Sequence, residues 1–533
     1  MTVTESESPS RTATFASLPH RLSPPFLSSL TKLASASTGA ATAPTTAVYS
    51  GESLAALPVA DPDAVNAAFA RARTAQQEWA NTPVRDRARI LLRFHDLVLA
   101  RQDEALDLMQ AENGKTRRDA FLEVMDIAIT ARYYARTAQR LLKPKRRKGA
   151  FPILTRTSEL RHPKGVVAVI SPWNYPLSMA AGDTIPALMA GNAVVQKPDT
   201  QTALTALWSL KLLREAGLPA DVWQMVIGRG SSIGDTLIQN ADYVMFTGST
   251  ASGRHIAAQA GEQLIGASLE LGGKNAMIVL PDADLDKTVR GAIDAAFPSA
   301  GQLCVSTERL YVPDVLYDEF TTRFATATKR LRIGGAYNWS MEVGSLTTPA
   351  QLDTVTSHVD DAVAKGATIL AGGNARPDLG PLFYEPTILT DVTADMALHA
   401  EETFGPVVSI YRYTNIDDAI QMANASPYGL NASVWSRDGA RARLVASRIH
   451  AGTVNVNEAF VAAWGSIDAP MGGMGDSGLG RRHGGDGLLK YTESQTIAHQ
   501  RLQGFTAPPG IAPDVWARTL TRALRLLKAT GTT

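Results

Sequence analysis

The chain has a single cysteine, Cys304, among its 533 residues, and this scarcity excludes several classes of protein. An intrachain disulfide needs a second cysteine, and a cysteine-rich zinc site needs several thiolates. A lone cysteine is most simply a small buried hydrophobic residue. Any chemical role for Cys304 must therefore be argued from the residues around it.

Charge imbalance and long apolar runs are also lacking. The formal net charge is +1, which gives no general attraction to nucleic acid or to acidic partners. No apolar run is long enough to span a bilayer. The N-terminal stretch MTVTESESPSRTATF carries acids and no apolar signal core. We therefore expect a cytoplasmic protein that binds no nucleic acid and does not depend on a membrane.

The composition is that of a globular chain, with 45% hydrophobic and 19% charged residues. Its length allows roughly two to four structural units. Residues 1–45 are rich in Ser, Thr and Ala and predict a flexible arm. Residues 61–140 show helical periodicity. The basic run KPKRRK, residues 143–148, predicts a solvated loop rather than an anion-binding patch, because no aromatic residues interleave with its charges.

From about residue 164 the pattern changes to short β-branched runs that alternate with helical stretches. This alternation predicts a parallel, doubly wound α/β sheet. A second alternating region extends from about 305 to 470. The expected strands are 165–170, 192–197, 223–227, 243–246 and 275–280, followed by 308–312, 407–411, 432–435 and 453–456.

Three short motifs could carry chemistry. Cys304 ends GQLC, and a loop that leads into a helix N-terminus would give its thiol access and thiolate character. Glu270, in LELGGKN, lies in an apolar stretch that would raise its pKa and suit a general base. Asn174 lies between two prolines in PWNYP, where its amide could face a developing oxyanion. Each motif alone also fits an ordinary loop or core residue.

Six motifs in order give a stronger signal. The chain contains PWNYP (172–176), KPD from Lys197, FTGST (246–250), LELGGKN (269–275), GQLC (301–304) and EETFGPV (401–407). Together they closely resemble the aldehyde dehydrogenase superfamily over about residues 46–500. The resemblance implies oxidation of an aldehyde to a carboxylic acid, with reduction of a nicotinamide dinucleotide.

The resemblance also implies roles for individual residues. Cys304 would attack the aldehyde, the Asn174 amide would stabilise the oxyanion, and Glu270 would activate the water that releases the acid. No metal is implied. The expected cofactor-binding residues are Trp173, Lys197, Thr200, Gly248, Ser249, Glu402 and Phe404.

The implied fold is an α/β aldehyde dehydrogenase fold. A Rossmann-like cofactor domain would comprise 46–147 and 163–272, and an α/β catalytic domain would comprise 273–475. A β-arm for oligomerisation would use 148–162 and 491–504, which implies a homodimer or homotetramer. Residues 1–45 and 505–533 would be tails.

Thr200 bears on the choice of dinucleotide. NAD-preferring relatives often carry glutamate at this position, where its carboxylate accepts a bond from the ribose 2′-hydroxyl and would repel a 2′-phosphate. Thr200 removes that repulsion, and Lys197 could meet the phosphate. We therefore expect NADP to be preferred and NAD to be possible. Asp199 is a nearby anion whose direction the sequence does not reveal.

The segments that carry a finer resemblance are YARTAQRLLKP, PWNYPLSM, GPLFYEPT, NASVW and PMGGMGDSGLGRRHG. They resemble the NADP-dependent succinate-semialdehyde branch of the superfamily, so the expected substrate is succinate semialdehyde. Two arginines that usually hold the substrate carboxylate in that branch are replaced here by Gly182 and Pro298, while Ser466 matches a third anchor. Arg309 is nearby but fits a structural role. A medium-chain or aromatic aldehyde is therefore the alternative. Glu270 argues against a coenzyme-A-acylating enzyme, and the intact Cys304 and Asn174 argue against a non-enzymatic binding protein.

The C-terminal tail predicts an amphipathic helix. Asp514 could cap its start, and Trp516, Leu520, Leu524 and Leu527 share one face. The apolar stripe favours docking on the chain's own or a neighbouring subunit, and an anionic membrane surface is the alternative.

Overall fold

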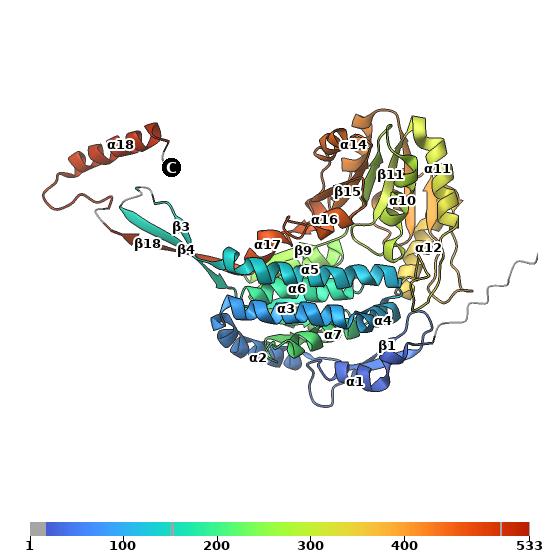
Figure 1. Ribbon diagram of the computed structural model, residues 1–533, viewed down its shortest axis with the longest axis horizontal. Coiled ribbons are helices and arrows are strands. Elements are labelled where there is room, and N and C mark those ends of the chain that lie inside the picture. The colour runs from blue at the N-terminus through green and yellow to red at the C-terminus, as the bar shows by residue number, and fades with distance from the viewer. Residues whose placement is uncertain (1–16, 150, 152–153, 502–503, 532–533) are drawn as a thin grey trace, which may run out of the picture.

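Two sheets and a projecting arm organise the molecule (Figure 1). The computed structural model describes residues 17–149, 151, 154–501 and 504–531. Among the helices of these ranges, none combines the length and apolar character that a membrane span requires.

The first sheet confirms the predicted doubly wound α/β architecture. Its order is β17-β9-β8-β5-β6-β7, and every neighbouring pair is parallel except β17 with β9. The chain runs from β5 outward to β7 and then returns to β8 on the other side of β5, so a topological switch point lies between β5 and β8. The strands are β5 Val166–Ile170, β6 Ala193–Lys197, β7 Trp223–Met225, β8 Tyr243–Thr247, β9 Gly266–Glu270 and β17 Gly478–Leu479.

Helices cover both faces of this sheet, because its strands are apolar on both sides. Alternate residues face opposite layers: Val167 packs with the layer that includes α3, α5, α6 and α7, and Val166 packs with α2, α8 and α9. The helices are α2 Pro62–Asn81, α3 Val84–Ala100, α4 Gln102–Asn113, α5 Arg117–Leu142, α6 Pro176–Met189, α7 Ala203–Glu215, α8 Gly230–Gln239, α9 Thr250–Glu262 and α17 Gly484–Leu489.

The second sheet has the order β12-β13-β14-β11-β10-β15-β16 and is parallel except for β12. The expected strand 275–280 is real but belongs here, as β10. The strands are β10 Asn275–Val279, β11 Thr307–Pro313, β12 Thr368–Ala371, β13 Thr387–Thr390, β14 Val407–Tyr413, β15 Asn431–Trp435 and β16 Thr453–Val456. The helices of this region are α10 Leu285–Ala296, α11 Asp314–Lys329, α12 Pro349–Ala364, α13 Ala397–Ala400, α14 Ile416–Asn424, α15 Gly439–Ala446 and α16 Val461–Gly465.

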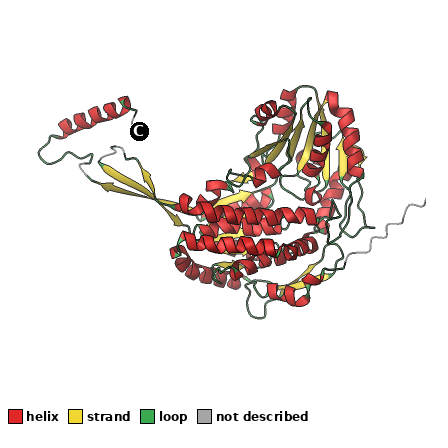
Figure 2. Ribbon diagram, in the orientation of Figure 1, coloured by secondary structure: helices red, strands yellow, loops and turns green. Residues whose placement is uncertain are grey.

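The arm is a three-stranded antiparallel sheet of order β18-β4-β3, formed by Lys145–Arg147 (β3), Thr155–Pro163 (β4) and Thr492–Gln500 (β18). Residues Thr155–Pro163 and Thr492–Gln500, from the two segments expected to form an arm, pair with each other along their whole length, while the role of this arm in oligomerisation stays a prediction. The expectation of a loop at 143–148 is wrong, because residues 145–147 pair with β4, but the expected exposure to solvent is confirmed for most of the run. Figure 2 shows this sheet extending away from the body.

Both tails differ from expectation. The predicted flexible arm of residues 1–45 is wrong for its second part, where α1 (Pro24–Thr31) buries Leu27 and Leu30 and β1 (Thr42–Thr46) pairs with β2 (Ser53–Pro58). Most of its first part, residues 1–16, lies outside the described residues.

At the other end, α18 (Pro513–Ala529) forms as predicted but buries none of its residues, and it lies beyond the arm rather than on the body (Figure 1). Ala512 occupies the N-cap position, so the expected cap by Asp514 is wrong; Asp514 instead pairs with Arg518 at 2.7 Å. A neighbouring subunit and a membrane surface both remain open as partners of the apolar face.

Candidate active site

A cavity of about 300 Å³ lies where loops of the two sheets meet. The first sheet contributes the loops that follow β5, β8 and β9, and the second contributes residues around 303–305, 402–404, 464 and 471. Ligands of open α/β sheets bind at the carboxyl ends of the strands beside a topological switch point. The cavity occupies that position, between the ends of β5 and β8.

Eight of the residues predicted from the sequence line this one cavity, although they are far apart in the chain. From the first sheet come Trp173, Asn174, Gly248, Ser249 and Glu270, and from the second comes Cys304. Glu402 and Phe404 complete the set. The structure therefore brings the three expected catalytic residues together with five of the seven expected cofactor-binding residues.

Cys304 lies in a turn that precedes β11, not at a helix N-terminus, so that expectation is wrong. The thiol consequently lacks the helix dipole that would favour its anion. Burial, together with the nearby carboxyl groups of Glu402 and Glu270, raises the pKa of the Cys304 thiol to about 12. Cys304 is therefore protonated at neutral pH and needs a base when it reacts.

The backbone just before Cys304 is strained. Ser299 and Ala300 have φ values of 49° and 55°, a left-handed region that costs non-glycine residues of order 1 kcal/mol each. Gly301 has φ 73°, and a Cβ there would lie 1.9 Å from the carbonyl oxygen of Gly405. Glycine is required at position 301 because the cysteine loop and the loop after Phe404 approach so closely.

Glu270 ends β9, and its side chain is only 5% exposed. Among the described residues, its Oε1 atom has no hydrogen-bond partner. Burial raises the pKa of Glu270 to about 7, against the lowering effect of Arg482. The predicted direction of this pKa shift is confirmed. At neutral pH the protonated and deprotonated forms of this carboxyl group have similar populations, which suits a general base that accepts and then releases a proton.

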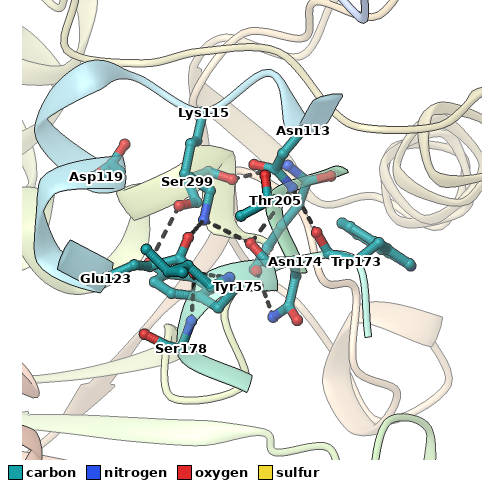
Figure 3. Close-up of polar contacts among 12 residues, drawn as sticks. Asn113, Lys115, Asp119, Glu123, Trp173, Asn174, Tyr175, Ser178, Thr205 and Ser299 are labelled. Carbon is teal, nitrogen blue, oxygen red and sulfur yellow. Dashed lines mark hydrogen bonds and ion pairs between the residues drawn. The ribbon is translucent and has the colours of Figure 1, made fainter. Parts of the chain in front are cut away.

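Asn174 is held by a buried polar network that the sequence motifs did not reveal (Figure 3). Its carbonyl accepts a hydrogen bond from Lys115 Nζ at 2.7 Å, and Asn113 donates to the carbonyl of Trp173 at 3.0 Å. Its own amide donates one hydrogen to the carbonyl of Gln302 at 3.0 Å. One amide hydrogen of Asn174 thus remains for a bound ligand, with the group already oriented.

Lys115 connects the Asn174 loop to Glu123. Lys115 and Glu123 form an ion pair, and both side chains are fully buried. Glu123 also accepts bonds from the backbone N–H groups of Leu177 and Ser178 at 2.8 and 3.0 Å, in the first turn of α6. The pair therefore ties α5 to the start of α6 and to the loop that carries Asn174. Helical periodicity cannot find such residues, because it looks for apolar positions.

A second buried pair positions Glu402 and Phe404. Lys274 pairs with Glu308, and Glu308 accepts the backbone N–H groups of Thr403 and Phe404, each at 3.0 Å. The Phe404 ring meets the edge of Trp173 at a centroid distance of 5.6 Å. Glu402 accepts the Gly273 N–H at 2.9 Å, and burial raises its pKa to about 8.

Lys197, Thr200 and Ser466 lie outside the cavity lining. Lys197 ends β6, the strand beside β5, and is buried; Thr200 follows it and is half-buried. The Asp199 carboxylate accepts the backbone N–H of Gln201 at 2.9 Å, which settles its direction. Ser466 is exposed and donates its hydroxyl to the carbonyl of Ala462.

Two arginines near the site, Arg309 and Arg482, have different roles. Arg309 is buried and donates to the carbonyls of Lys274, Met422 and Ala423, so its structural role is confirmed. Arg482, which sequence reasoning missed, lines the cavity beside Glu270 and Met179 and pairs with Asp183 at 2.6 Å. The segment PMGGMGDSGLGRRHG contains Arg482, but it contributed only to the family resemblance and gave this residue no role.

Comparison with known proteins agrees with this geometry. The sequence profile of the Aldehyde dehydrogenase family matches residues 35–497. A protein of Mycobacterium ulcerans named "Putative succinate-semialdehyde dehydrogenase [NADP(+)] 2" is 51% identical over 478 residues, 90% of this chain and 92% of the relative. A rice protein named "Succinate-semialdehyde dehydrogenase, mitochondrial" is 36% identical, with 85% of each chain covered.

Solved structures show the same fold. An Escherichia coli structure described as an "NADP dependent enzyme" has a TM-score of 0.83 and 34% identity, over 86% of this chain and 95% of that one. Betaine aldehyde dehydrogenase of Staphylococcus aureus, solved in complex with NAD+, has a TM-score of 0.83 and 30% identity, over 91% of this chain and 99% of that one.

Proposed function

This chain belongs to the aldehyde dehydrogenase family, and from that premise we propose that it oxidises succinate semialdehyde to succinate through Cys304, with NADP as its cofactor. The observation that carries the proposal is the meeting of Cys304, Glu270 and Asn174 in one cavity.

The residues divide the reaction among themselves. The Cys304 sulfur adds to the aldehyde carbonyl carbon, and the thiol proton passes to solvent water as the thiohemiacetal anion forms. The Asn174 amide and the backbone N–H of Cys304 stabilise the oxyanion. Once the adduct has lost hydride, Glu270 takes a proton from water, and the hydroxide attacks the thioester carbon. The carbon–sulfur bond then breaks and releases the acid.

The nucleotide side of the cavity fits a dinucleotide. The N-terminus of α9 begins beside Gly248, is capped by Ser249 and has no acidic residue in its first turn, which suits a pyrophosphate. The buried Thr247 hydroxyl has no partner among the described residues. Glu402 and Phe404 would hold the nicotinamide ribose and ring, and Trp173 would lie beside them. When bound, the cofactor supplies the acceptor for the hydride.

Substitution of Thr200 by glutamate should shift cofactor preference from NADP toward NAD. The introduced carboxylate would repel a 2′-phosphate and accept a hydrogen bond from a 2′-hydroxyl. We expect the ratio of kcat/KM for NADP to that for NAD to fall by about 10- to 100-fold. Thr200→Gln, which has a similar size without the charge, is the control. An unchanged ratio in Thr200→Glu would mean that residue 200 does not face the ribose.

Turnover should depend on pH through Glu270. The carboxylate must be deprotonated to accept a proton from water, and its pKa is raised to about 7. Below that pH, kcat for acid release should fall about tenfold per pH unit, and above it kcat should level off. Glu402, with a pKa near 8, titrates in the same window. The Glu402→Gln variant should therefore keep the inflection near pH 7, and its loss there would assign the inflection to Glu402.

The substrate assignment is supported by the names of the relatives that cover most of this chain. A medium-chain or aromatic aldehyde is the second candidate, favoured by the apolar part of the lining, which includes Met179, Leu303, Val305, Trp464 and Met471. A panel of succinate semialdehyde, butanal, octanal and benzaldehyde, each with NADP and NAD, tests both. The highest kcat/KM for a neutral aldehyde would overturn the succinate-semialdehyde proposal.

Assembly into a homodimer or homotetramer is part of the proposal. Strand β18 forms one edge of the arm, and its residues from Glu493 to Gln500 are exposed. Strand edges with unpaired backbone groups are suited to pairing with another chain. The arm and α18 both extend beyond the body, where a second copy could reach them (Figure 1).

A further inference from the structure

Among the residues that the structure describes, the lining of the aldehyde cavity has one cationic side chain, that of Arg482. The other charged groups there, Glu270 and Glu402, are acids, and most of the remaining wall is apolar or aromatic. A substrate with a carboxylate needs a partner for that charge, because an unpaired anion in a largely apolar cavity is strongly disfavoured. Arg482 is the available partner.

The guanidinium of Arg482 has strong hydrogen-bond acceptors on its Nε and Nη2 side and only a weak one at Nη1. Its Nε and Nη2 atoms donate to the two carboxylate oxygens of Asp183, at 3.2 and 2.6 Å. Its Nη1 atom contacts only the sulfur of Met179, at 3.2 Å, among the described residues. A thioether sulfur is a weak acceptor, so the two hydrogens on Nη1 are far from satisfied. Met179 and Arg482 both line the cavity, so their contact places this end of the guanidinium at the cavity wall.

The position of Arg482 is fixed by its backbone as well. Residues 471 and 482 exchange two backbone hydrogen bonds, at 2.8 and 2.7 Å, and Met471 also lines the cavity. The side chain is 12% exposed, and Asp183 on α6 holds its far side. A guanidinium group held in one orientation by such contacts loses little conformational freedom when it binds a carboxylate.

Arg482 also acts within range of the reacting groups. Burial raises the pKa of both the Cys304 thiol and the Glu270 carboxyl, and the positive charge of Arg482 offsets part of that rise. Behind it lies a small cavity that is shared with Gly182, Asp183 and Lys490. A Cβ at Gly182 would have one neighbour within 4 Å, the Asp126 carboxylate at 3.8 Å, so the glycine leaves open space on this side.

We propose that Arg482 binds the carboxylate of the substrate and thereby makes this enzyme selective for short aldehydes that carry a carboxylate at the far end. The inference rests on the proposed function, and it deepens it by naming the residue that selects the substrate class. Arg482 enters the active site from the glycine-rich loop and supplies the positive charge that is missing at Gly182 and Pro298.

The test compares succinate semialdehyde with butanal, which has the same number of carbon atoms and no charge. In Arg482→Met, kcat/KM for succinate semialdehyde should fall by about 100-fold, mainly through KM, because a charge-assisted bond is lost. For butanal the fall should be smaller by at least about tenfold, because a neutral substrate loses only the effect of the Arg482 charge on Cys304 and Glu270. Arg482→Lys should restore part of the preference. An equal fall for both aldehydes would overturn the proposal, since it would show that Arg482 only supports the fold or Glu270.

Two control variants keep the test decisive. Arg481→Gln alters the neighbouring arginine, which donates to the carbonyls of Gly473 and Gly480 and is not in the lining; it should affect both aldehydes alike. Loss of Arg482 alone leaves Asp183 buried without its partner. If Arg482→Met does not fold, the double variant Asp183→Asn/Arg482→Met removes both charges, and the same loss of preference is expected.

Failure of the substrate assignment can be told apart from failure of this inference. If the wild-type enzyme prefers glutarate semialdehyde, the name of the substrate is wrong while the role of Arg482 stands, provided that Arg482→Met removes that preference. Calorimetric titration with succinate gives a second readout that needs no turnover. Its Kd should rise about 100-fold in Arg482→Met. A wild-type enzyme that binds succinate no better than butanamide would overturn the role of Arg482.

Discussion

Replacement of Cys304 by alanine should abolish aldehyde oxidation, with a fall in kcat of at least about 10⁴-fold, because the covalent bond to the substrate cannot form. No second thiol can take its place, since Cys304 is the only cysteine of the chain. Binding of the dinucleotide should persist, because the residues proposed to hold it are untouched. Formation of reduced cofactor measures the first effect, and calorimetry measures the second.

Cys304→Ser sharpens this test. Serine keeps the size and the hydrogen-bonding capacity but is a much weaker nucleophile, and the pKa of the native thiol is already raised to about 12 by its surroundings. We expect Cys304→Ser to be nearly as inactive as Cys304→Ala. Turnover within about tenfold of wild type in either variant would contradict a covalent mechanism at this residue.

Replacement of Glu270 by glutamine should separate the two halves of the reaction. Hydride transfer precedes hydrolysis, so the variant should produce a burst of reduced cofactor close to one equivalent per active site. Steady turnover should then be slower than wild type by about 10²- to 10⁴-fold, the usual contribution of a general base. Rapid mixing with succinate semialdehyde and NADP resolves the two phases.

The amplitude of the burst decides the role of Glu270. The buried Oε1 atom of Glu270 has no partner among the described residues, so its substitution by an amide should leave the cavity intact. A folded variant that lacks the burst would show that Glu270 is needed before hydride transfer, for example to take the proton of the Cys304 thiol. That result would assign Glu270 to the formation of the adduct instead of, or in addition to, its hydrolysis.

The sequence predicted the strands well where apolar runs were bounded by turn residues, as at Val166–Ile170 and Ala193–Lys197. It predicted the content of the cavity because Cys304, Glu270 and Asn174 each stand in a motif. The alternation grouped the strand at 275–280 with the first sheet, whereas the family resemblance placed it in the catalytic domain, and the structure has it in the second sheet. Local patterns indicate that a strand forms, but its neighbours are chosen by contacts between distant residues.

Residues that support the site were missed for a different reason. Lys115, Glu123 and Arg482 are charged, and charged residues are normally expected at the surface. Lys115 and Glu123 are fully buried because they pair with each other, and Arg482 is only 12% exposed because it pairs with the buried Asp183. Arg482 and Asp183 are 299 residues apart in the chain, a separation that periodicity does not register. Local sequence patterns also could not show that Cys304 lies in a turn rather than at a helix N-terminus. A turn and a helix N-terminus both begin with a loop, and only the structure shows which one follows.

The solitary position of Cys304 offers a direct way to count working molecules. An alkylating reagent added to the native enzyme has one sulfhydryl target per chain, and that target lines the aldehyde cavity. The labelled fraction, read by intact mass spectrometry, therefore equals the fraction of chains with an open and unoxidised site. Comparison with labelling after denaturation separates blocked sites from oxidised ones, so specific activities of different variants can be corrected without a reference preparation.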